Sequence, residues 1–161
     1  MTERWIIDVS PLILLGKSGQ LEWLPRMGRI VVPESVANEV AAGSPGDPAR
    51  LWLEAPVGMA SIIRDPVIAD ELLAWDLGRG ENAVIAFALA HPGHEAVLND
   101  AAARRCAAVF GIPLRGTLSF VALAKKRGLV TACRPVFEKM QTAGLVVSQA
   151  LVDQVALSIG E

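Results

Sequence analysis

Arg4-Trp5-Ile6-Ile7-Asp8-Val9-Ser10-Pro11 carries the strongest structural signal in this chain. Its apolar residues are nearly continuous rather than alternating with polar ones, which predicts a strand from Arg4 to about Val9 that is covered on both faces. Ser10 is a preferred N-cap residue, and Pro11 fits the first turn of a helix. We therefore expect a strand followed at once by a helix that starts at Ser10.

Asp8 stands at the end of this apolar strand. A carboxylate in such surroundings costs free energy unless it has a partner, so Asp8 is the strongest candidate for a functional residue. The alternative is a turn-forming Asp whose carboxylate accepts hydrogen bonds from the nearby backbone. Ser10, two residues further on, is a supporting candidate whose hydroxyl could orient a metal-bound water.

The rest of the chain alternates short apolar runs with longer helical patterns. Such alternation predicts βαβ units, and therefore an α/β fold in which a central parallel sheet lies between helices on both faces, in three layers. Further strands are expected at 29–32, 57–63, 95–99 and 112–114. Helices are expected from 33 onward and at 49–53, 65–75, 81–90, 100–110, 116–127, 133–142 and 148–158.

Three further acids, Glu39, Glu81 and Asp100, are candidates to join Asp8. In open α/β sheets, sites form outside the carboxyl ends of the strands, where Asp8 and Asp100 are both expected. Four convergent carboxylates repel one another, but they suit a hard cation such as Mg²⁺, which prefers oxygen ligands. Each also has a simpler interpretation: Asp100 as a helix N-cap, Glu81 as a first-turn acid and Glu39 as a solvated helical residue.

Length and composition predict a globular protein. With 161 residues, of which 52% are hydrophobic, we expect one domain over residues 1–161 with a sizeable core. No apolar run reaches the roughly 18–20 residues that span a membrane, and the run at 11–15 follows charged residues, unlike a signal peptide. A cytoplasmic location is therefore expected. Cys106 and Cys133 are interpreted as buried small hydrophobic residues, because disulfides are rare in reducing compartments.

The net charge is −2, which argues against a strongly basic nucleic-acid coat protein. The charge is uneven: residues 1–80 hold seven basic and eleven acidic side chains, whereas residues 81–161 hold eight and six. A basic rim beside an acidic centre suits a phosphate-backbone substrate held by a metal site, and the candidate backbone contacts are Arg104, Arg115 and Lys125. The alternatives are that Arg104 pairs with an acid, and that the cations at 125–127 complement the dipole of a helix ending there.

Other active-site motifs are absent from the sequence. Leu15-Gly16-Lys17-Ser18 resembles the end of a phosphate-binding Walker loop, but Pro11 stands where the upstream glycine is required. No Gly-x-Ser-x-Gly nucleophile elbow occurs. His91 and His94 flank Pro92-Gly93 and are interpreted as loop residues, because no second His or Cys stands at zinc-ligand spacing.

Taken in order, the acids and their neighbours resemble the motifs of PIN-domain nucleases. Residues 6–12, Ile-Ile-Asp-Val-Ser-Pro-Leu, are similar to the opening strand of that family, and residues 32–40 to its segment of proline, helix and Glu. Residues 80–86 and 98–104 resemble the Gly-Glu-x-x-Ala-Ile-Ala and Asp-Asp-x-x-Ala-Arg segments of one subgroup. Residues 111–117 and 124–129 resemble its closing pattern, so the resemblance covers nearly the whole chain.

The resemblance implies a PIN-like domain that hydrolyses RNA as an endoribonuclease dependent on Mg²⁺ or Mn²⁺. The metal would lower the pKa of a bound water and stabilise the leaving oxygen. One position departs from the subgroup: Asn99 stands where the first of two adjacent acids is usual, so the metal role is carried over to Asp100. The implied catalytic residues and metal ligands are therefore Asp8, Glu39, Glu81 and Asp100.

Many PIN proteins of this size resemble the toxins of toxin–antitoxin pairs of the VapC type, which implies an antitoxin partner besides RNA. The apolar segments 12–15, 21–24 and 51–53 could line an antitoxin groove or a homodimer interface, although core packing accounts for at least half of them. Two other function classes stay open: a PIN-like module that binds RNA or protein without cleavage, and another phosphoryl-transfer enzyme. The latter is disfavoured, because Ser10 stands where haloacid-type phosphatases carry a second Asp.

Overall fold

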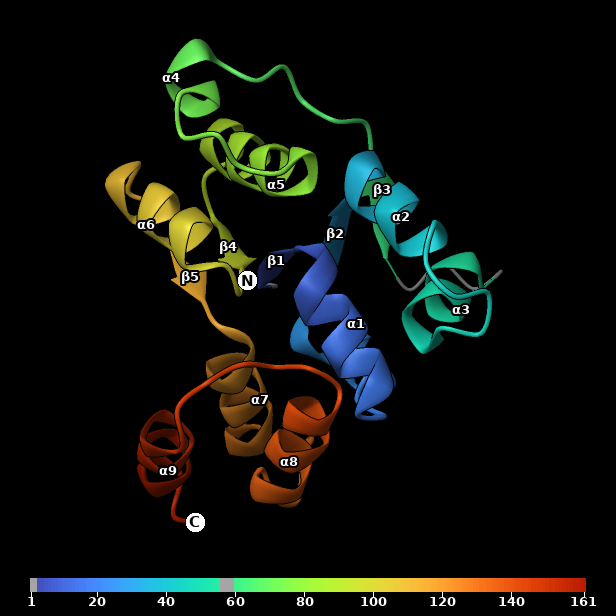
Figure 1. The fold of residues 1–161 in the computed structure, drawn as a ribbon, viewed down its shortest axis with the longest axis vertical. Helices are drawn as coiled ribbons and strands as arrows, with labels where there is room; N and C mark the ends of the chain where they lie inside the picture. The colour runs from blue at the N-terminus through green and yellow to red at the C-terminus, as the bar shows by residue number, and fades with distance from the viewer. Residues whose placement is uncertain (1–2, 56–59) are drawn as a thin grey trace.

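Figure 1 shows the computed structural model, which describes residues 3–55 and 60–161. Within these residues, parallel strands form one five-stranded sheet in the order β3-β2-β1-β4-β5. Their bounds are β1 Arg4–Ile7, β2 Arg29–Pro33, β3 Ser61–Ile63, β4 His94–Val97 and β5 Leu114–Arg115. The prediction of an α/β fold with a central parallel sheet in three layers is confirmed.

The central strand β1 sets the register of its neighbours. Ile6 pairs with Val31 of β2 on one side and with Ala96 of β4 on the other. The pairing extends one residue beyond the strand, where the amide of Asp8 donates to the carbonyl oxygen of Val97 at 3.3 Å. Because the strands are parallel, their carboxyl ends meet at one edge of the sheet, which brings the residues after β1 and β4 together.

Helices cover both faces of the sheet. The ring of Trp5 lies 4.9 Å from that of Phe120, which places α7 (Thr117–Lys126) on one face. Phe87 of α5 (Arg79–Ala90) packs against His94 of β4. Trp5 pairs with Glu95, the residue after His94, and successive side chains of a strand point to opposite faces of the sheet. Helix α5 therefore covers the other face. The remaining helices are α1 Val9–Lys17, the 3₁₀ helix η1 Leu24–Met27, α2 Glu34–Ala41, α3 Pro48–Glu54, α4 Asp70–Leu73, α6 Ala101–Val109, α8 Arg134–Thr142 and α9 Gln149–Ser158.

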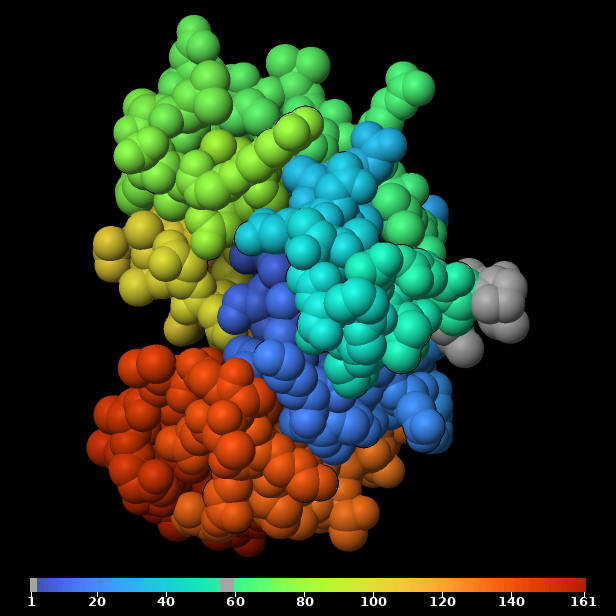
Figure 2. All heavy atoms as spheres, turned by 45° about the vertical axis from the view of Figure 1, so that its right-hand side comes forward, coloured from blue at the N-terminus to red at the C-terminus, as the bar shows by residue number. Residues whose placement is uncertain are grey.

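The end of the chain packs against its beginning. In Figure 2 the carboxyl-terminal residues, coloured orange and red, lie directly against the blue helix α1. Helix α8 contacts α1, and α9 contacts both α7 and α8. The α8–α9 hairpin therefore forms a wall beside the helix that follows the central strand.

The segment between β3 and α5 differs from the prediction. The helix predicted for 65–75 is wrong, because only Asp70–Leu73 is helical and residues 64–69 have no regular structure. Asp65 does not begin a helix; its carboxylate accepts hydrogen bonds from the amide and the hydroxyl of Ser35 at 3.0 and 2.9 Å, at the start of α2. The strand predicted for 57–63 is confirmed as Ser61–Ile63, and residues 57–59 lie outside the described residues.

The interpretation of His94 as a loop residue is also wrong. His94 begins β4 and is buried, and its ring meets that of Phe87 edge-on. Its Nδ1 lies 2.9 Å from the carbonyl oxygen of His91, which does stand in the turn after α5. Burial lowers the pKa of His94, and the nearby Arg4 lowers it further. A neutral histidine that packs on an aromatic ring can occupy this core position, which the polar flanking sequence concealed.

Cys106 and Cys133 are both buried and free, as expected of small hydrophobic residues. Burial raises the pKa of both thiols, that of Cys133 to about 11, so both remain protonated at neutral pH. Across residues 3–55 and 60–161, no helix is long and apolar enough to cross a lipid bilayer.

The close approach of α1 and α3 depends on Gly16. A Cβ atom at this position would lie 2.9 Å from the backbone nitrogen of Ala49 and 3.2 Å from the Cβ of Pro48. We expect Gly16→Ala to lower the free energy of unfolding by about 1–3 kcal/mol, because backbone must move to admit the methyl group. Urea denaturation measures this. Gly46→Ala is the control: a Cβ there meets nothing within 4 Å, so its effect should stay within about 0.5 kcal/mol. Equal effects of the two substitutions would contradict the packing argument.

Candidate active site

Asp8 lies at the carboxyl edge of the sheet, and only 5% of the residue is exposed. It occupies the N-cap position of α1, but its carboxylate makes no capping hydrogen bond. The prediction that Ser10 caps this helix is therefore wrong, because α1 begins at Val9 and Ser10 lies within its first turn. Burial raises the pKa of Asp8 to about 7; a hydrogen bond from the Val9 backbone opposes the rise, and three nearby acids add to it: Glu81, Glu39 and Asp100.

Glu81 and Glu39 approach Asp8 from the helices on one face of the sheet. Glu81, in the first turn of α5, accepts a hydrogen bond from the amide of Gly78 at 3.1 Å, so its predicted place at a helix start is confirmed. Burial raises the pKa of Glu81, and the negative charges of Asp100 and Glu39 raise it further. Glu39 lies on α2 and is exposed.

Gly80 lies close to the carboxylates of Asp8 and Glu39. A Cβ atom on Gly80 would lie 3.3 Å from Oδ1 of Asp8 and 3.7 Å from Oε2 of Glu39. The start of α5 thus passes close to both acids, at a distance that leaves little room for a side chain. The lack of a side chain at Gly80 therefore helps to shape the site. The Gly-Glu motif is the sequence pattern that indicates this.

Asp100 caps a helix and also lies in the cleft beside the other acids. Its Oδ2 accepts a hydrogen bond from the amide of Ala103 at 2.9 Å, which caps α6. It also lines the same cleft as Asp8 and Glu81, together with Ser10 and Asn99. This cleft has a volume of about 570 Å³. Glu39 is not among the residues that line it, although its charge reaches Asp8.

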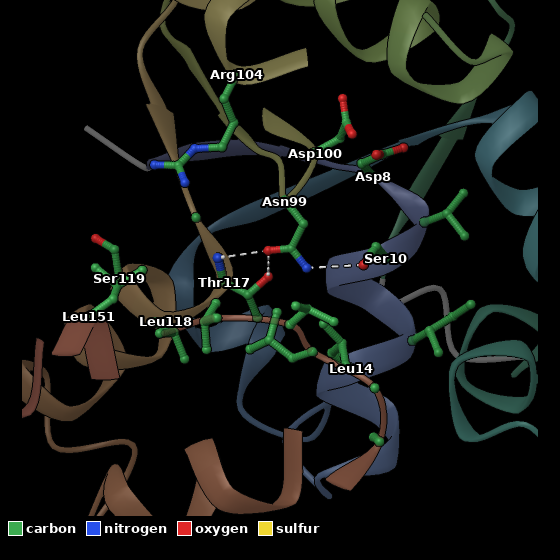
Figure 3. A pocket seen from close by; sticks show the side chains of 18 of the residues that line it. Asp8, Ser10, Leu14, Asn99, Asp100, Arg104, Thr117, Leu118, Ser119 and Leu151 are labelled. Carbon is green, nitrogen blue, oxygen red and sulfur yellow. Dashed lines mark hydrogen bonds between the residues drawn. The ribbon is translucent and has the colours of Figure 1, made fainter. Parts of the chain in front are cut away.

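Asn99 connects three segments that are distant in sequence (Figure 3). Its Nδ2 donates to Oγ of Ser10 at 3.0 Å. Its Oδ1 accepts from the hydroxyl of Thr117 at 2.6 Å and from the Thr117 amide at 3.4 Å. The sequence analysis treated Asn99 only as a departure from a two-acid motif and did not single out Thr117. The Gly-Thr pair at the start of α7 was the signal that could have revealed this connection.

Asn99→Ala is expected to lower the free energy of unfolding by about 1–3 kcal/mol, because it leaves the buried Thr117 hydroxyl without its acceptor. The loss is measured by urea denaturation. Asn38→Ala, at an exposed position of α2, is the control and should change stability by less than about 0.5 kcal/mol. A stability of Asn99→Ala equal to that of the wild type would show that the network contributes nothing.

The three candidate RNA contacts differ in their surroundings. Arg115 forms an ion pair with Glu95 at 2.5 Å, and Lys125 forms one with Glu161 at 2.6 Å and does not line the cleft. Arg104 lines the cleft and, among residues 3–55 and 60–161, has no ion-pair partner, so the alternative that it pairs with an acid is not observed. Its guanidinium lies against Gly116, 3.4 Å from where a Cβ would stand.

The chemistry of the acids fits a hard divalent cation. Their oxygens are the donors that Mg²⁺ prefers, and Mg²⁺ is usually held by one or two carboxylates while it keeps several waters. The raised pKa of the buried Asp8 also indicates a carboxylate that lacks a positive partner. In the part of the chain that the structure describes, however, no three His, Cys, Asp or Glu side chains lie close enough together to enclose an ion.

Comparison with known families identifies the protein class. A parallel α/β sheet with acids gathered at its carboxyl edge is an arrangement suited to metal-assisted phosphate chemistry. The chain matches a protein-family model, DUF3368, described as a PIN domain, over residues 4–161. It therefore belongs to the PIN-domain family, whose members are typically metal-dependent nucleases. No curated protein shows significant similarity to the chain.

Proposed function

We propose that this protein is an endoribonuclease that uses Mg²⁺ or Mn²⁺ to hydrolyse RNA phosphodiester bonds. The observation that carries the proposal is the buried carboxylate of Asp8, which stands among other acids and, within the described residues, forms no ion pair with a basic side chain. Such a group destabilises the fold, so its presence indicates that it serves a function. The expected metal ligands are Asp8, Glu39, Glu81 and Asp100.

The divalent ion, when bound, supplies Lewis-acid chemistry that activates water and stabilises charge on the phosphate. The residues of the chain fix the donors. Asp8 is held by its place between β1 and α1, Glu81 by the Gly78 amide and Asp100 by the Ala103 amide. Asn99 fixes the hydroxyl of Ser10 at the edge of the same cleft. These three donors are thus positioned at helix starts.

We further propose that residues 1–161 form one PIN-like domain that acts in the cytoplasm as the toxin of a toxin–antitoxin pair. The resemblance of its motifs to VapC-type toxins supports this role, and an antitoxin protein is then its expected partner. Of the apolar segments considered for an interface, 12–15 and 21–24 are largely buried in the core, whereas Leu51 is exposed. A homodimer through the α3 surface is therefore a second expected contact.

A non-catalytic PIN-like binding module is the second candidate. It is favoured by one observation: within residues 3–55 and 60–161, no three potential ligands are close enough to enclose a metal ion. Isothermal titration with Mn²⁺ separates the two candidates, because an inert module need not bind the ion. Saturable binding that Asp8→Asn abolishes would support the nuclease.

The direct test is cleavage of a mixed panel of structured and single-stranded RNAs with Mg²⁺, with Mn²⁺ and with EDTA. Cleavage that requires both the metal and Asp8 would support the proposal. If folded protein, free of any bound inhibitor, cleaves none of these RNAs under any condition, the proposal is wrong and the binding module takes its place.

A further inference from the structure

The cleft beside the acids has a polar half and an apolar half (Figure 3). Asp8, Asp100 and Arg104 lie at one end of the view, and Asn99 with its hydrogen bonds to Ser10 and Thr117 lies next to them. The other end is lined by aliphatic side chains from α1, α7, α9 and the connection between α8 and α9. They include Leu14, Leu118, Leu145, Val147, Leu151 and Val155.

The burial of Asp8 determines how a substrate must approach. With only 5% of the residue exposed, this carboxylate can be reached through the cleft but not across a flat surface. A phosphate brought to the acids carries a ribose and a base with it. Some part of the nucleoside next to that phosphate must therefore occupy the space that adjoins the acids, which includes the apolar half.

The lining of the apolar half suits a nucleobase. A base has two apolar faces, which aliphatic side chains can sandwich, and a polar edge. Leu14 lies on α1, Leu118 on α7 and Leu151 on α9, while the hydroxyl-bearing Ser119 also lines the cleft. In a duplex the base faces are stacked and covered, so only an unpaired base could enter.

Arg104 provides a charge for the phosphate. It lines the cleft near Asp100 and, among the described residues, belongs to no ion pair. Gly116 leaves room for its guanidinium at the start of α7, at 3.4 Å from the position of a Cβ. A guanidinium is well suited to a phosphate, with which it forms paired hydrogen bonds.

The size of the cleft favours a nucleotide over a protein segment. Its volume of about 570 Å³ falls within the range of about 300–1,000 Å³ that is usual for small-molecule sites. A stable protein partner needs about 800 Å² of contact on each side, which calls for a longer groove. Resting on the proposed nuclease function, we infer that the cleft accepts one unpaired RNA nucleotide, its phosphate between the acids and Arg104 and its base in the apolar half.

The test measures RNA binding without turnover. Fluorescein-labelled single-stranded RNA of mixed sequence is titrated with Asp8→Asn protein, and binding is followed by fluorescence anisotropy. A series of the same RNA carries one abasic ribose at each position in turn. We expect one position at which loss of the base weakens binding about tenfold, and a similar loss when the RNA is annealed to its complement.

Two leucines of α9 provide a matched pair of variants. Leu151 lines the cleft and is 40% exposed, whereas Leu157 lies outside it and is 71% exposed, so neither substitution should unfold the protein. In the same Asp8→Asn background, Leu151→Ser should weaken binding of intact RNA about tenfold but leave binding of RNA that is abasic at the sensitive position unchanged. Leu157→Ser should affect neither RNA.

Cleavage by the wild-type protein is measured separately, so that the inference and the proposed function can fail independently. Suppose that the protein cleaves RNA with metal, but that no abasic position weakens RNA binding, or that Leu151→Ser and Leu157→Ser bind RNA equally well. The nucleotide site would then be wrong, and the nuclease function would stand. If Leu151→Ser changes only self-association in light scattering, the apolar half is a protein interface and the inference is wrong. If no RNA is bound or cleaved, both fail.

Discussion

Asp8→Asn is expected to reduce metal-dependent RNA cleavage on the order of a thousandfold, equivalent to about 4 kcal/mol of transition-state stabilisation, and at the same time to make the folded protein more stable at pH 8. Activity falls because an amide lacks the negative charge that the cation requires. Stability rises because burial, together with Glu81, Glu39 and Asp100, raises the pKa of Asp8 to about 7, so the ionised form is unfavourable in the folded state.

The pH dependence of this stability follows from the direction of the shift. The pKa of Asp8 rises from an ordinary value of 3.8 to about 7, so the folded protein holds this proton more tightly than the unfolded chain does. Below about pH 4, Asp8 is protonated in both the folded and the unfolded state and does not lower the free energy of unfolding. As the pH rises, its destabilising effect grows, and it is complete above pH 7. A shift of about three units corresponds to at most roughly 4 kcal/mol. In metal-free urea denaturation, we expect Asp8→Asn to gain about 2–4 kcal/mol at pH 8 and almost nothing at pH 4.

Glu138→Gln removes one negative charge from an exposed position of α8 that does not line the cleft, and it serves as the control. It should alter neither cleavage nor stability beyond about 0.5 kcal/mol. An Asp8→Asn protein that cleaves RNA at the wild-type rate would rule out Asp8 as a catalytic residue. One that is less stable than the wild type at pH 8 would show that its carboxylate stabilises the fold.

The sequence predicts an element correctly where the local pattern of residues matches the burial of that element in the fold. The continuous apolar run at Trp5-Ile6-Ile7 predicts a strand covered on both faces, and it became the centre of the sheet. Asp100 before an alanine-rich segment predicts a helix start, and it caps α6. The rule that parallel strands end at a common edge then brings Asp8 and Asp100 to the same cleft.

The sequence does not predict features that depend on contacts between distant segments. Asp65-Pro66 has the local pattern of a helix start. The carboxylate of Asp65 instead accepts a hydrogen bond from Ser35, thirty positions earlier in the chain, at the start of α2. The connection of Asn99 to Ser10 and Thr117 spans three segments, and no single segment signals it. The apolar wall of the cleft likewise depends on how the α8–α9 hairpin packs, which tertiary structure alone decides.

At low metal concentration, RNA cleavage is expected to fall about tenfold for each pH unit below 7, and so about a hundredfold between pH 7 and pH 5. Burial raises the pKa of Asp8 to about 7, so a proton competes with the cation for this carboxylate throughout that range. Glu81, whose pKa is also raised by burial, can only steepen the decline.

Saturating metal is the control for this pH profile. A cation that binds the ionised carboxylate displaces the proton, so raising Mg²⁺ or Mn²⁺ should move the midpoint of the profile to lower pH. Initial rates on one single-stranded RNA, measured from pH 5 to pH 8 at low and at saturating metal, provide both curves. A rate that is independent of pH at low metal would mean that Asp8 is already ionised at pH 5. A midpoint that metal does not move would mean that the titrating group is not a ligand. Either result would contradict the proposal that a proton and the metal ion compete for the buried carboxylate of Asp8.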